Sequence, residues 1–585
     1  MKLETLRELG LLHVFDVHLA RCLGRLAAEA SDEVLLAAAL ASRRLREGHV
    51  CLDLAELEAG DQRGPGWPDL ERWLSALRSS PLVGEPGDHT PLVLQQTRLY
   101  LARYWDFEQT VCKAIRQRVY AAAGTGHELA HAGQRAAALE DSLVRFFPAP
   151  PQGGDDQQRR AARTAARSSF CVITGGPGTG KTSTMVRLLA ALVDHALGQG
   201  VEPPRVRLLA PTGKAAARMM QAVRAAKNSL QCDGAVLESV PDKASTIQRA
   251  LGPFTDSRTT FRHDGEHPLP VDLAVVDEAS MVDLALLAQL CSALPETASL
   301  VLLGDRNQLA SVQAGAVLGD ICGAGQHVES GPLSERIVEL RRSYRYSERS
   351  GIAELARAIE LGRAEDMLDV LRSDQWCDVE LIQDQGAFGP ALRARVLEGY
   401  AGCLRAQPVH DKLAAFERYR VLCAHRQGPY GAIALNSAIE RLLQEHRLVS
   451  RSEGHYAGRP LMVSTNDYTT GLFNGDVGMV VSSPGGLLTF FDDGSSTGRL
   501  LSTARLPPHE PVFAMTVHKS QGSEFDRIEV VLPPAPSPVL SRELLYTAVT
   551  RARSRVSLYA SVDSLVEAVR RPVARTSGLG AALWR

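Results

Sequence analysis

Glycines, a lysine and hydroxyl residues fill one short segment, GGPGTGKTS at residues 175–183. Its spacing fits G-x-x-x-x-G-K-[ST], a pattern in which glycines let backbone N–H groups turn toward a phosphate. A helix that begins there would add its positive N-terminal end, Lys181 would reach the β- and γ-phosphates, and Thr182 would coordinate Mg²⁺. The segment predicts a nucleotide site built from Gly175, Gly176, Pro177, Gly178, Thr179, Gly180, Lys181, Thr182 and Ser183.

Acidic and amide residues follow two further apolar runs. Asp277 and Glu278 end LAVVDE, while Asp305 and Gln308 lie in LLGDRNQL. Carboxylates that leave an apolar strand are costly unless a cation or hydrogen bonds receive them. Asp277 therefore fits a Mg²⁺ partner and Glu278 a general base that orients water, although acids at a helix start could also be simple caps. Asp305 and Gln308 would sit beside the γ-phosphate, since polar groups gather at the carboxyl ends of parallel strands.

These segments together predict a nucleoside triphosphatase, but they do not say what hydrolysis drives. A GTPase usually carries an N-K-x-D segment that reads guanine, and the chain has none. A third polar cluster, TVHKSQGSEFD at residues 516–526, suggests a metal site or an acid–base centre at first sight. It has a single histidine and no H-x-x-x-H pairing, so a metal site is a poor interpretation, and the general base is better placed at Glu278.

Short apolar runs alternate with helical runs around these segments. The candidate strands are SFCVIT, VRLLAP, LAVVDEA and ASLVLLGD, followed later by RYRVLCAH, RIEVVLP and RVSLYAS. Strands that alternate with helices form βαβ units, so we expect an α/β fold with parallel sheets in two domains. Between the later strands, GDVGMVVSSPGGLLTFFDDGSSTGRLL has the texture of antiparallel hairpins, which predicts a small β-barrel inserted at about 457–512.

The first part of the chain has helical patterning and no catalytic constellation. It ends at FFPAPPQGGDDQQ, whose prolines and glycines are typical of a linker. We therefore expect a helical N-terminal docking domain at 1–147, a first α/β domain at 148–340 and a second one at 341–585. Domains without a site usually serve binding.

Composition narrows the class of protein. The 585 residues carry a formal net charge of −2, so any contact with nucleic acid must be a local channel and not a globally basic surface. The ten cysteines form no C-x-x-C pair, which argues against zinc ribbons and iron–sulfur clusters and fits a reducing cytoplasm. We expect no signal peptide and no transmembrane helix, hence a cytoplasmic protein.

The motifs, taken in order, resemble those of the superfamily 1 DNA helicases, and most closely those of the D subunits of RecBCD helicase–nucleases (exodeoxyribonuclease V). The series is GGPGTGKT, APTGKAAAR, ASTIQRALG, VVDEASMVD, GDRNQLASVQAGAVLGD, LRRSYRY, NDYTTGLFNGDVG, TVHKSQGSEFD and LYTAVTRAR. The resemblance implies two RecA-like domains with ATP between them and single-stranded DNA across both, moved in the 5′-to-3′ direction. It also implies RecB-like and RecC-like partners, with the nuclease in a partner subunit.

The resemblance also assigns residues. Gln158 matches the glutamine that reads adenine, although Gln157 stands where relatives often carry an aromatic residue. Arg345 and Arg551 match arginines that approach the γ-phosphate, and Glu524 matches the residue near the ATP sugar. A planar guanidinium suits that task, because charge spreads over the phosphoryl oxygens in the transition state. The residues implied to contact DNA are Thr212, Lys214, Thr246, Thr516, His518 and Lys519.

Several alternatives stay open at this point. Without the resemblance, Arg345 would be interpreted as part of a solvated basic helix face. Arg218 is either a second DNA contact or a surface residue. Phe254 and Phe261, in the loop at 252–270, would touch DNA or anchor the loop. The function is that of a motor subunit in a DNA-end-processing complex, a stand-alone helicase of the same superfamily, or a regulatory subunit whose ATPase acts as a switch.

Overall fold

The computed structural model describes residues 3–27, 31–59, 67–120, 129–148, 156–254, 260–323, 331–346, 349–383, 386–451, 453–467, 469–492 and 498–584. Most of the expected linker, residues 149–155, lies outside these ranges. The helices of the first part are α1 (Leu3–Glu8), α2 (Val14–Ala27), α3 (Asp32–Arg46), α4 (Leu54–Ala59), α5 (Leu70–Arg78), α6 (Ala102–Tyr120) and α7 (Leu129–Phe146).

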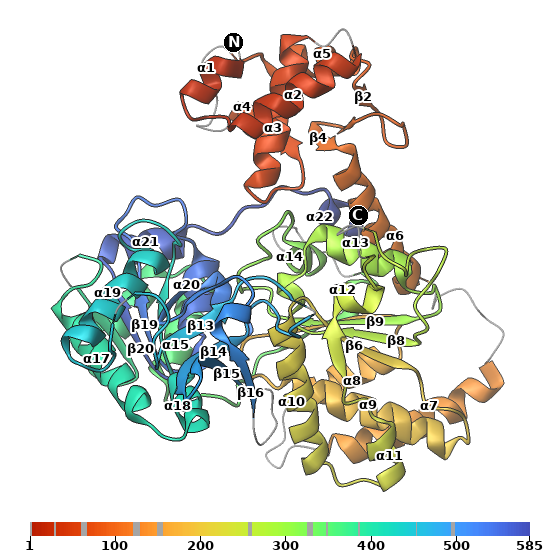
Figure 1. Ribbon diagram of the computed structural model, residues 1–585. Helices are drawn as coiled ribbons and strands as arrows, with labels where there is room; N and C mark the ends of the chain where they lie inside the picture. Colours follow the sequence, from red (N-terminus) through yellow and green to blue (C-terminus); the bar gives the residue numbers. More distant parts are fainter. Residues whose placement is uncertain are drawn as a thin grey trace.

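The N-terminal part combines helices with a small sheet that the sequence did not reveal. Strands β1 (Leu52–Asp53), β4 (Arg98–Leu101), β3 (Leu92–Gln95) and β2 (Val83–Gly84) lie in that order. One hydrophobic cluster draws only on residues from Leu3 to Leu101, and Figure 1 shows this part set apart from the rest above α6. Val50, Cys51, Val93 and Tyr100 of the same part join α6 in a cluster of the first parallel sheet, and the end of α7 joins the other cluster of that sheet. The limit expected at residue 147 stays a prediction.

The first large sheet is parallel, as the alternation of strands and helices predicts. Its order is β10-β5-β9-β8-β6-β7. The bounds are β5 (Phe170–Gly175), β6 (Val206–Ala210), β7 (Ala244–Thr246), β8 (Leu273–Val276), β9 (Ser299–Gly304) and β10 (Ile337–Leu340). Four of these strands were expected, whereas the short β7 and the edge strand β10 were not. The carboxyl ends of β5, β8 and β9 carry the phosphate motif and the two acidic motifs.

Helices cover both faces of this sheet. Because successive strand residues point to opposite faces, Cys171 and Ile173 of β5 join one core cluster, while Phe170 and Val172 join the other. The flanking helices are α8 (Gln157–Ala166), α9 (Lys181–Gly198), α10 (Gly213–Ser229), α11 (Gly234–Ser239), α12 (Ile247–Leu251), α13 (Leu284–Ala293) and α14 (Val317–Ile321). The α/β architecture expected for the first domain is confirmed.

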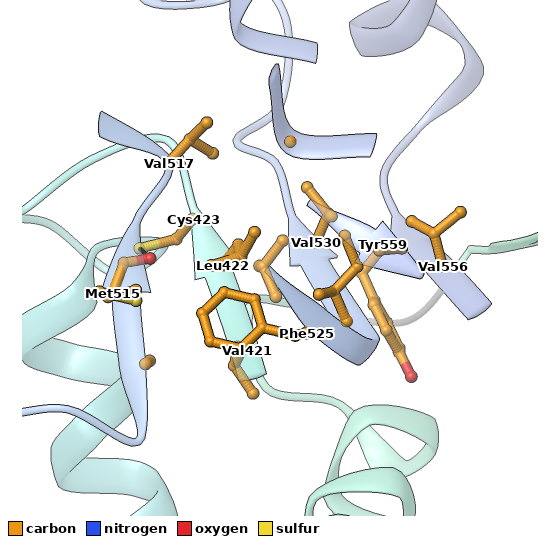
Figure 2. Packing of buried hydrophobic residues seen from close by; sticks show 14 of the residues in the cluster. Val421, Leu422, Cys423, Met515, Val517, Phe525, Val530, Val556 and Tyr559 are labelled. Atoms are coloured by element: carbon orange, nitrogen blue, oxygen red, sulfur yellow. Dashed lines mark hydrogen bonds between the residues drawn. The ribbon is translucent and has the colours of Figure 1, made fainter. Parts of the chain in front are cut away.

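The second large sheet is also parallel, with the order β11-β20-β19-β12-β18. Its bounds are β11 (Val379–Ile382), β12 (Tyr419–Cys423), β18 (Ala514–Thr516), β19 (Phe525–Val531) and β20 (Ala552–Tyr559). The helices around it are α15 (Gly351–Glu360), α16 (Ala364–Arg372), α17 (Pro390–Arg405), α18 (Val409–Phe416), α19 (Ala432–Glu445), α20 (Arg542–Val549) and α21 (Val562–Arg570). Figure 2 shows Val421, Val530 and Val556 of three neighbouring strands packed in one core.

The inserted β region is an antiparallel sheet with the order β16-β15-β14-β13-β17. Its strands are β13 (Pro460–Val463), β14 (Val477–Ser483), β15 (Gly486–Phe491), β16 (Arg499–Ser502) and β17 (His509–Pro511). Within the described residues the outer strands β16 and β17 do not pair, so the sheet is open there, and the closed barrel stays a prediction. Strand β17 leads directly into β18 and thus attaches the insert to the second parallel sheet.

Residues 571–584, which we name the C-terminal strap, cross from the second sheet back to the first. Arg575 donates from Nη1 to the carbonyls of Gln313 at 2.8 Å and Gly315 at 2.9 Å. The backbone of Thr576 bonds to the N-terminal part through His49 Nδ1 at 3.0 Å. The strap ends in α22 (Leu579–Leu583), which lies beside α14 and α6 (Figure 1). No helix in the described ranges combines the length and apolar character that crossing a bilayer requires.

We expect Leu579→Ala to loosen the strap, because the Leu579 side chain is 1% exposed and packs into the core beneath the first sheet. Removing a buried leucine side chain costs about 2–5 kcal/mol of unfolding free energy. Urea unfolding followed by circular dichroism would measure the loss. Val573→Ala is the matched control, since Val573 lies on the same strap but is 37% exposed. Equal stability of the two variants would contradict a packed strap.

Candidate active site

The phosphate motif forms a loop between β5 and α9. Gly178 and Gly180 have φ angles of 76° and 84°, a left-handed conformation that favours glycine. Helix α9 begins at Lys181 with Gly180 as its N-cap, and no side chain caps it. Its first N–H groups are therefore available to an anion. The ammonium of Lys181 donates to the carbonyl oxygens of Gly175 at 2.5 Å and Gly176 at 3.0 Å, which holds it inside the loop.

The first acidic pair lies next to this loop, at the end of β8. Burial and the charge of Glu278 raise the pKa of Asp277 to about 6, while the charge of Lys181 acts in the opposite direction. Glu278 adopts a left-handed φ of 52°, and its N–H donates to Asp277 Oδ1 at 2.9 Å. A nearby cation stabilises the ionised form of a carboxylate that burial makes costly to ionise. The donor set of Asp277 with Thr182 therefore fits a divalent cation.

The second acidic motif contacts both domains. Gln308 donates to Asp305 Oδ2 at 3.0 Å, and the hydroxyl of Tyr546 on α20 donates to the same oxygen at 3.1 Å. Burial raises the pKa of Asp305. The N–H of Leu309 donates to Thr547 Oγ1 at 2.8 Å. The end of β9 is thus joined directly to the second domain.

The segment after β10 lies across the phosphate loop. The N–H of Tyr344 donates to the carbonyl of Gly178 at 2.8 Å, and Ser343 Oγ donates to the carbonyl of Pro177 at 3.2 Å. The Arg345 side chain extends away to form an ion pair with Glu524 and donates to the carbonyl of Thr550 at 3.4 Å. We expected Arg345 to belong to the second domain. In the structure the backbone beside it is bonded to the phosphate loop and its side chain reaches Glu524 and Thr550, so its assignment to the second domain stays a prediction.

The remaining nucleotide residues surround this junction. Gln158 Nε2 donates to the carbonyl of Thr179 at 3.2 Å, beside the phosphate loop. Gln157 Oε1 instead accepts from the N–H of Arg341 at 2.7 Å. Arg551 is buried at the end of α20, where it donates to the carbonyls of Thr547 at 3.2 Å and Ser523 at 3.1 Å. Ser183 lies half-buried in the first turn of α9.

Several arginines surround the carboxylate of Glu524 at the junction between the two parallel sheets. It pairs with Arg345 and, at 3.1 Å, with Arg553. Burial alone would raise the pKa of Glu524, but the charges of Arg345, Arg218 and Arg551 together lower it. The carboxylate therefore stays ionised in a half-buried place.

Two residues of this junction, Tyr344 and Tyr546, escaped the sequence analysis, and the role of a third, Arg218, was left open. Tyr344 is 62% exposed, and its ring lies about 4.0 Å from a Cβ built on Gly180, next to Gln158. The signal was present in LRRSYRY, since an aromatic residue precedes Arg345. Tyr546 donates to Asp305 from the other domain, and nothing in its spacing could reveal that contact. Arg218 was left between a DNA contact and a surface role, whereas it faces the cleft near Glu524.

The residues expected to bind DNA fall into two groups. Thr212 Oγ1 and Thr246 Oγ1 each accept a backbone N–H at 3.2 Å, from Ala215 and Arg249, and so cap α10 and α12. Their hydroxyl hydrogens are left free to donate. Lys214 lies in a pocket that α10 forms with the second domain, lined by Arg218, Glu417, Arg420 and Glu524. Burial and then Arg218 lower the pKa of Lys214 to about 8.

The second group comes from TVHKSQGSEFD. Thr516 Oγ1 accepts the N–H of Lys519 at 3.3 Å, and Lys519 Nζ donates to Glu510 at 2.5 Å. Burial lowers the pKa of His518, with a further contribution from Arg575 of the strap. Gln521 donates to the carbonyl of Leu309 at 2.7 Å. The cluster therefore joins the two domains, and the described residues hold no group of three His, Cys, Asp or Glu side chains that could bind a metal ion.

Of the two phenylalanines in the loop at 252–270, Phe261 packs partly buried against the core beneath the first sheet. Phe254 is 49% exposed. Part of this loop, residues 255–259, lies outside the described ranges. Phe261 thus anchors the loop, and Phe254 is the one that faces solvent.

Comparison with known proteins gives the family. The model for the N-terminal domain of RecBCD enzyme subunit RecD matches residues 8–100, an AAA domain model matches 154–379, and a UvrD-like helicase C-terminal domain model matches 511–559. RecBCD enzyme subunit RecD of Mycobacterium tuberculosis is 41% identical, over 98% of this chain and 96% of its own length. The chain belongs to the RecD family. RecD of Mycolicibacterium smegmatis is 40% identical, over 99% and 98% of the two chains.

Other similar proteins cover a smaller share of this RecD-family chain. The ATP-dependent RecD2 DNA helicase of Deinococcus radiodurans is 33% identical over 70% of this chain and 49% of its own length. Among solved structures, Bacteroides Pif1 bound to ssDNA aligns with 70% of this chain and 93% of its own at 16% identity, with a TM-score of 0.39. Family membership and the helicase domain models make the chain an ATP-dependent helicase subunit.

We expect Gly178→Ala to weaken ATP binding about tenfold or more, because a left-handed φ strains alanine. The added Cβ would also lie 2.3 Å from the Cβ of Arg345. Titration with a fluorescent ATP analogue would measure the affinity. Gly198→Ala is the control, since Gly198 ends α9 with nothing within 4 Å of an added Cβ. Unchanged affinity in Gly178→Ala would contradict the contact between the loop and Arg345.

Proposed function

We propose that the chain uses ATP hydrolysis to move 5′-to-3′ along single-stranded DNA. It would do so as the motor subunit of a RecBCD-type helicase–nuclease that processes double-strand ends for recombinational repair. One observation carries this proposal most directly. The phosphate loop of the first sheet and Arg345, Arg551 and Glu524 meet in one cleft between two parallel sheets.

ATP would occupy this cleft together with Mg²⁺. The loop N–H groups, the free end of α9 and Lys181 would hold the phosphates, and Thr182 with Asp277 would hold the cation, which neutralises phosphate charge when bound. Lys181 would exchange its two carbonyl acceptors for phosphate oxygens. Gln158 and the exposed ring of Tyr344 lie where they could hold the base, with the ring in the place of the stacking partner that Gln157 does not provide.

The catalytic steps would need both domains. Glu278 would orient the attacking water as general base, and Gln308, fixed by Asp305, would lie beside the γ-phosphate. Arg345 and Arg551 would stabilise the charge that spreads over the phosphoryl oxygens. Both arginines have other acceptors in this structure, namely Glu524 and backbone carbonyls. Their release onto the phosphate would link hydrolysis to movement of the domains.

DNA would lie across both sheets and contact Thr212, Lys214, Thr246, Thr516, His518 and Lys519. Hydroxyl, ammonium and backbone donors recognise phosphate and not base edges, which suits a motor that runs over any sequence. The low pKa of His518 makes it a neutral contact at physiological pH. Gln521 donates to the carbonyl of Leu309, which follows Gln308 of the second acidic motif. The segment at 516–526 would therefore transmit DNA binding to the ATP site.

The partners would be RecB-like and RecC-like subunits that dock through the N-terminal domain at 1–147. The exposed large hydrophobic residues of the chain include Leu9, Val14, Phe15 and Leu26, all within α1, α2 and their connection. Such side chains commonly mark protein contacts. We assign the nuclease to a partner and the location to the cytoplasm. The domain limits at 147/148 and 340/341 are part of this proposal.

The ATPase of the purified chain should rise when single-stranded DNA is added, and Lys181→Gln should abolish turnover, because it removes the cation that holds the β- and γ-phosphates. Lys113→Gln, an exposed lysine on α6, should behave as wild type. A duplex with a 5′ tail should be unwound and one with a 3′ tail should not. An ATPase that ignores DNA would contradict the motor function. A chain that is inert until partners are added would favour the regulatory alternative.

Phe15→Asp should reduce recovery of the partner subunits about tenfold, because a charge at an apolar contact must be desolvated. Co-purification with a tagged chain from the native cell would measure it, while the ATPase of the isolated variant should stay at the wild-type value. Leu361→Asp is the matched control, since Leu361 is a comparably exposed apolar residue at the end of α15. Undiminished recovery would contradict docking through this part of the chain.

A further inference from the structure

Two basic residues project from equivalent points of neighbouring strands in the second sheet. Strands β12 and β18 pair in parallel, with Cys423 opposite Thr516. Arg426 follows the end of β12 by three residues, and Lys519 follows the end of β18 by three. Figure 2 shows the two strand ends side by side at Cys423 and Val517, where the N–H of Val517 donates to the Cys423 carbonyl at 2.9 Å. The carboxyl edge of the sheet therefore brings both cations together.

One carboxylate of the inserted sheet lies between these cations. Glu510 on β17 accepts from Lys519 Nζ through Oε1 at 2.5 Å, and its Oε2 lies 3.5 Å from Arg426 Nη2. Each oxygen thus serves one cation. Strand β17 runs directly into β18, and Glu510 pairs with Met462 of β13, so its backbone is fixed by the antiparallel sheet. The bridge joins the insert to the edge of the second sheet.

The charges of this bridge do not balance. Two cations face one carboxylate, which leaves an excess positive charge. Arg426 is the most open member, with 63% of its side chain exposed, against 32% for Lys519 and 24% for Glu510. Helix α19 begins behind Arg426, where Ile433 donates its N–H to the Arg426 carbonyl at 3.1 Å, and its N-cap Gly431 has no capping side chain. The positive end of that helix adds to the same field.

We propose that Arg426 and Lys519 form one phosphate-binding site for the DNA backbone and that Glu510 occupies it as an internal competitor until DNA displaces it. This inference rests on the proposed DNA-binding function but names a contact, Arg426, and a competing group that the motifs do not contain. A carboxylate resembles a phosphate oxygen pair in charge and in its ability to accept from both cations. Binding of DNA would exchange the Glu510 acceptor for a phosphate, and the carboxylate would return to water.

The competitor has a functional consequence. The pairs of Glu510 with Arg426 and Lys519 stay partly open to solvent, which screens them, so the exchange lowers the affinity for single strands only modestly and does not block it. A strand would then fill the site only when other contacts already hold it. The site would therefore favour DNA that is already bound over free DNA. Only one carboxylate lies between the two cations, so the free-energy cost of displacing it applies to a single bound phosphate.

Fluorescence anisotropy of a labelled oligo(dT) with the full chain tests this proposal. Glu510→Gln should bind about two- to fivefold tighter, since it removes a competitor of surface ion-pair strength. Glu510→Ala should shift affinity in the same direction. Arg426→Gln should bind about three- to tenfold weaker, and the slope of log K against log salt should fall by about 0.7, the value for one phosphate on a single strand.

Matched controls separate the site from general charge effects. Glu445→Gln removes a carboxylate paired with Arg393 at 3.3 Å, and Arg441→Gln removes an exposed arginine of the same helix α19. Both should bind as wild type. Binding of the oligonucleotide by the wild-type chain would uphold the DNA function. Weaker or unchanged binding in both Glu510 variants, or an unchanged slope in Arg426→Gln, would then overturn the inference alone. A wild-type chain that does not bind the oligonucleotide would overturn both.

Discussion

The side chain of Arg345 joins the phosphate loop to the second parallel sheet, and the geometry of the cleft depends on that link. The N–H of Tyr344 and the hydroxyl of Ser343, which precede Arg345 in the chain, donate to carbonyls of the loop. The guanidinium of Arg345 pairs with Glu524. The contacts of Tyr546 with Asp305 and of Leu309 with Thr547 close the same junction. Because each is polar and directional, small shifts between the sheets would break them.

Several of the cations assigned to ligands already have an internal acceptor. Lys181 bonds to loop carbonyls, Arg345 to Glu524, Arg551 to the carbonyls of Thr547 and Ser523, and Lys519 to Glu510. A half-buried cation without an acceptor would be costly, so the protein keeps the ligand-free state folded by supplying oxygens of its own. On the proposed function, anionic ligands would bind by exchange. Such exchange would make binding weaker than an empty cationic site would allow, and each binding event would release a carboxylate or carbonyl.

The strap and the inserted sheet extend this dependence beyond the cleft. Arg575 of the strap holds the carbonyls of Gln313 and Gly315, close to the motif of Asp305 and Gln308, and Thr576 bonds to His49 of the N-terminal part. The inserted sheet contacts the edge of the second sheet through Glu510. The segment at 516–526 thus lies near both the inserted sheet, through Lys519 and Glu510, and the strap, through His518 and Arg575.

The sequence by itself determined the phosphate loop, the acids at the strand ends and the parallel strands, because glycine conformation, apolar runs and the position of polar residues after them are local properties. The resemblance to superfamily 1 helicases further implied that Arg345, Arg551 and Glu524 lie near one nucleotide, which stays a prediction. Only the tertiary structure decided what these side chains contact. The ion pair of Arg345, the position of Arg218 beside Glu524 and the path of the strap depend on which distant surfaces pack together. No local pattern encodes those contacts, since they arise from long-range burial and charge pairing between separate sheets.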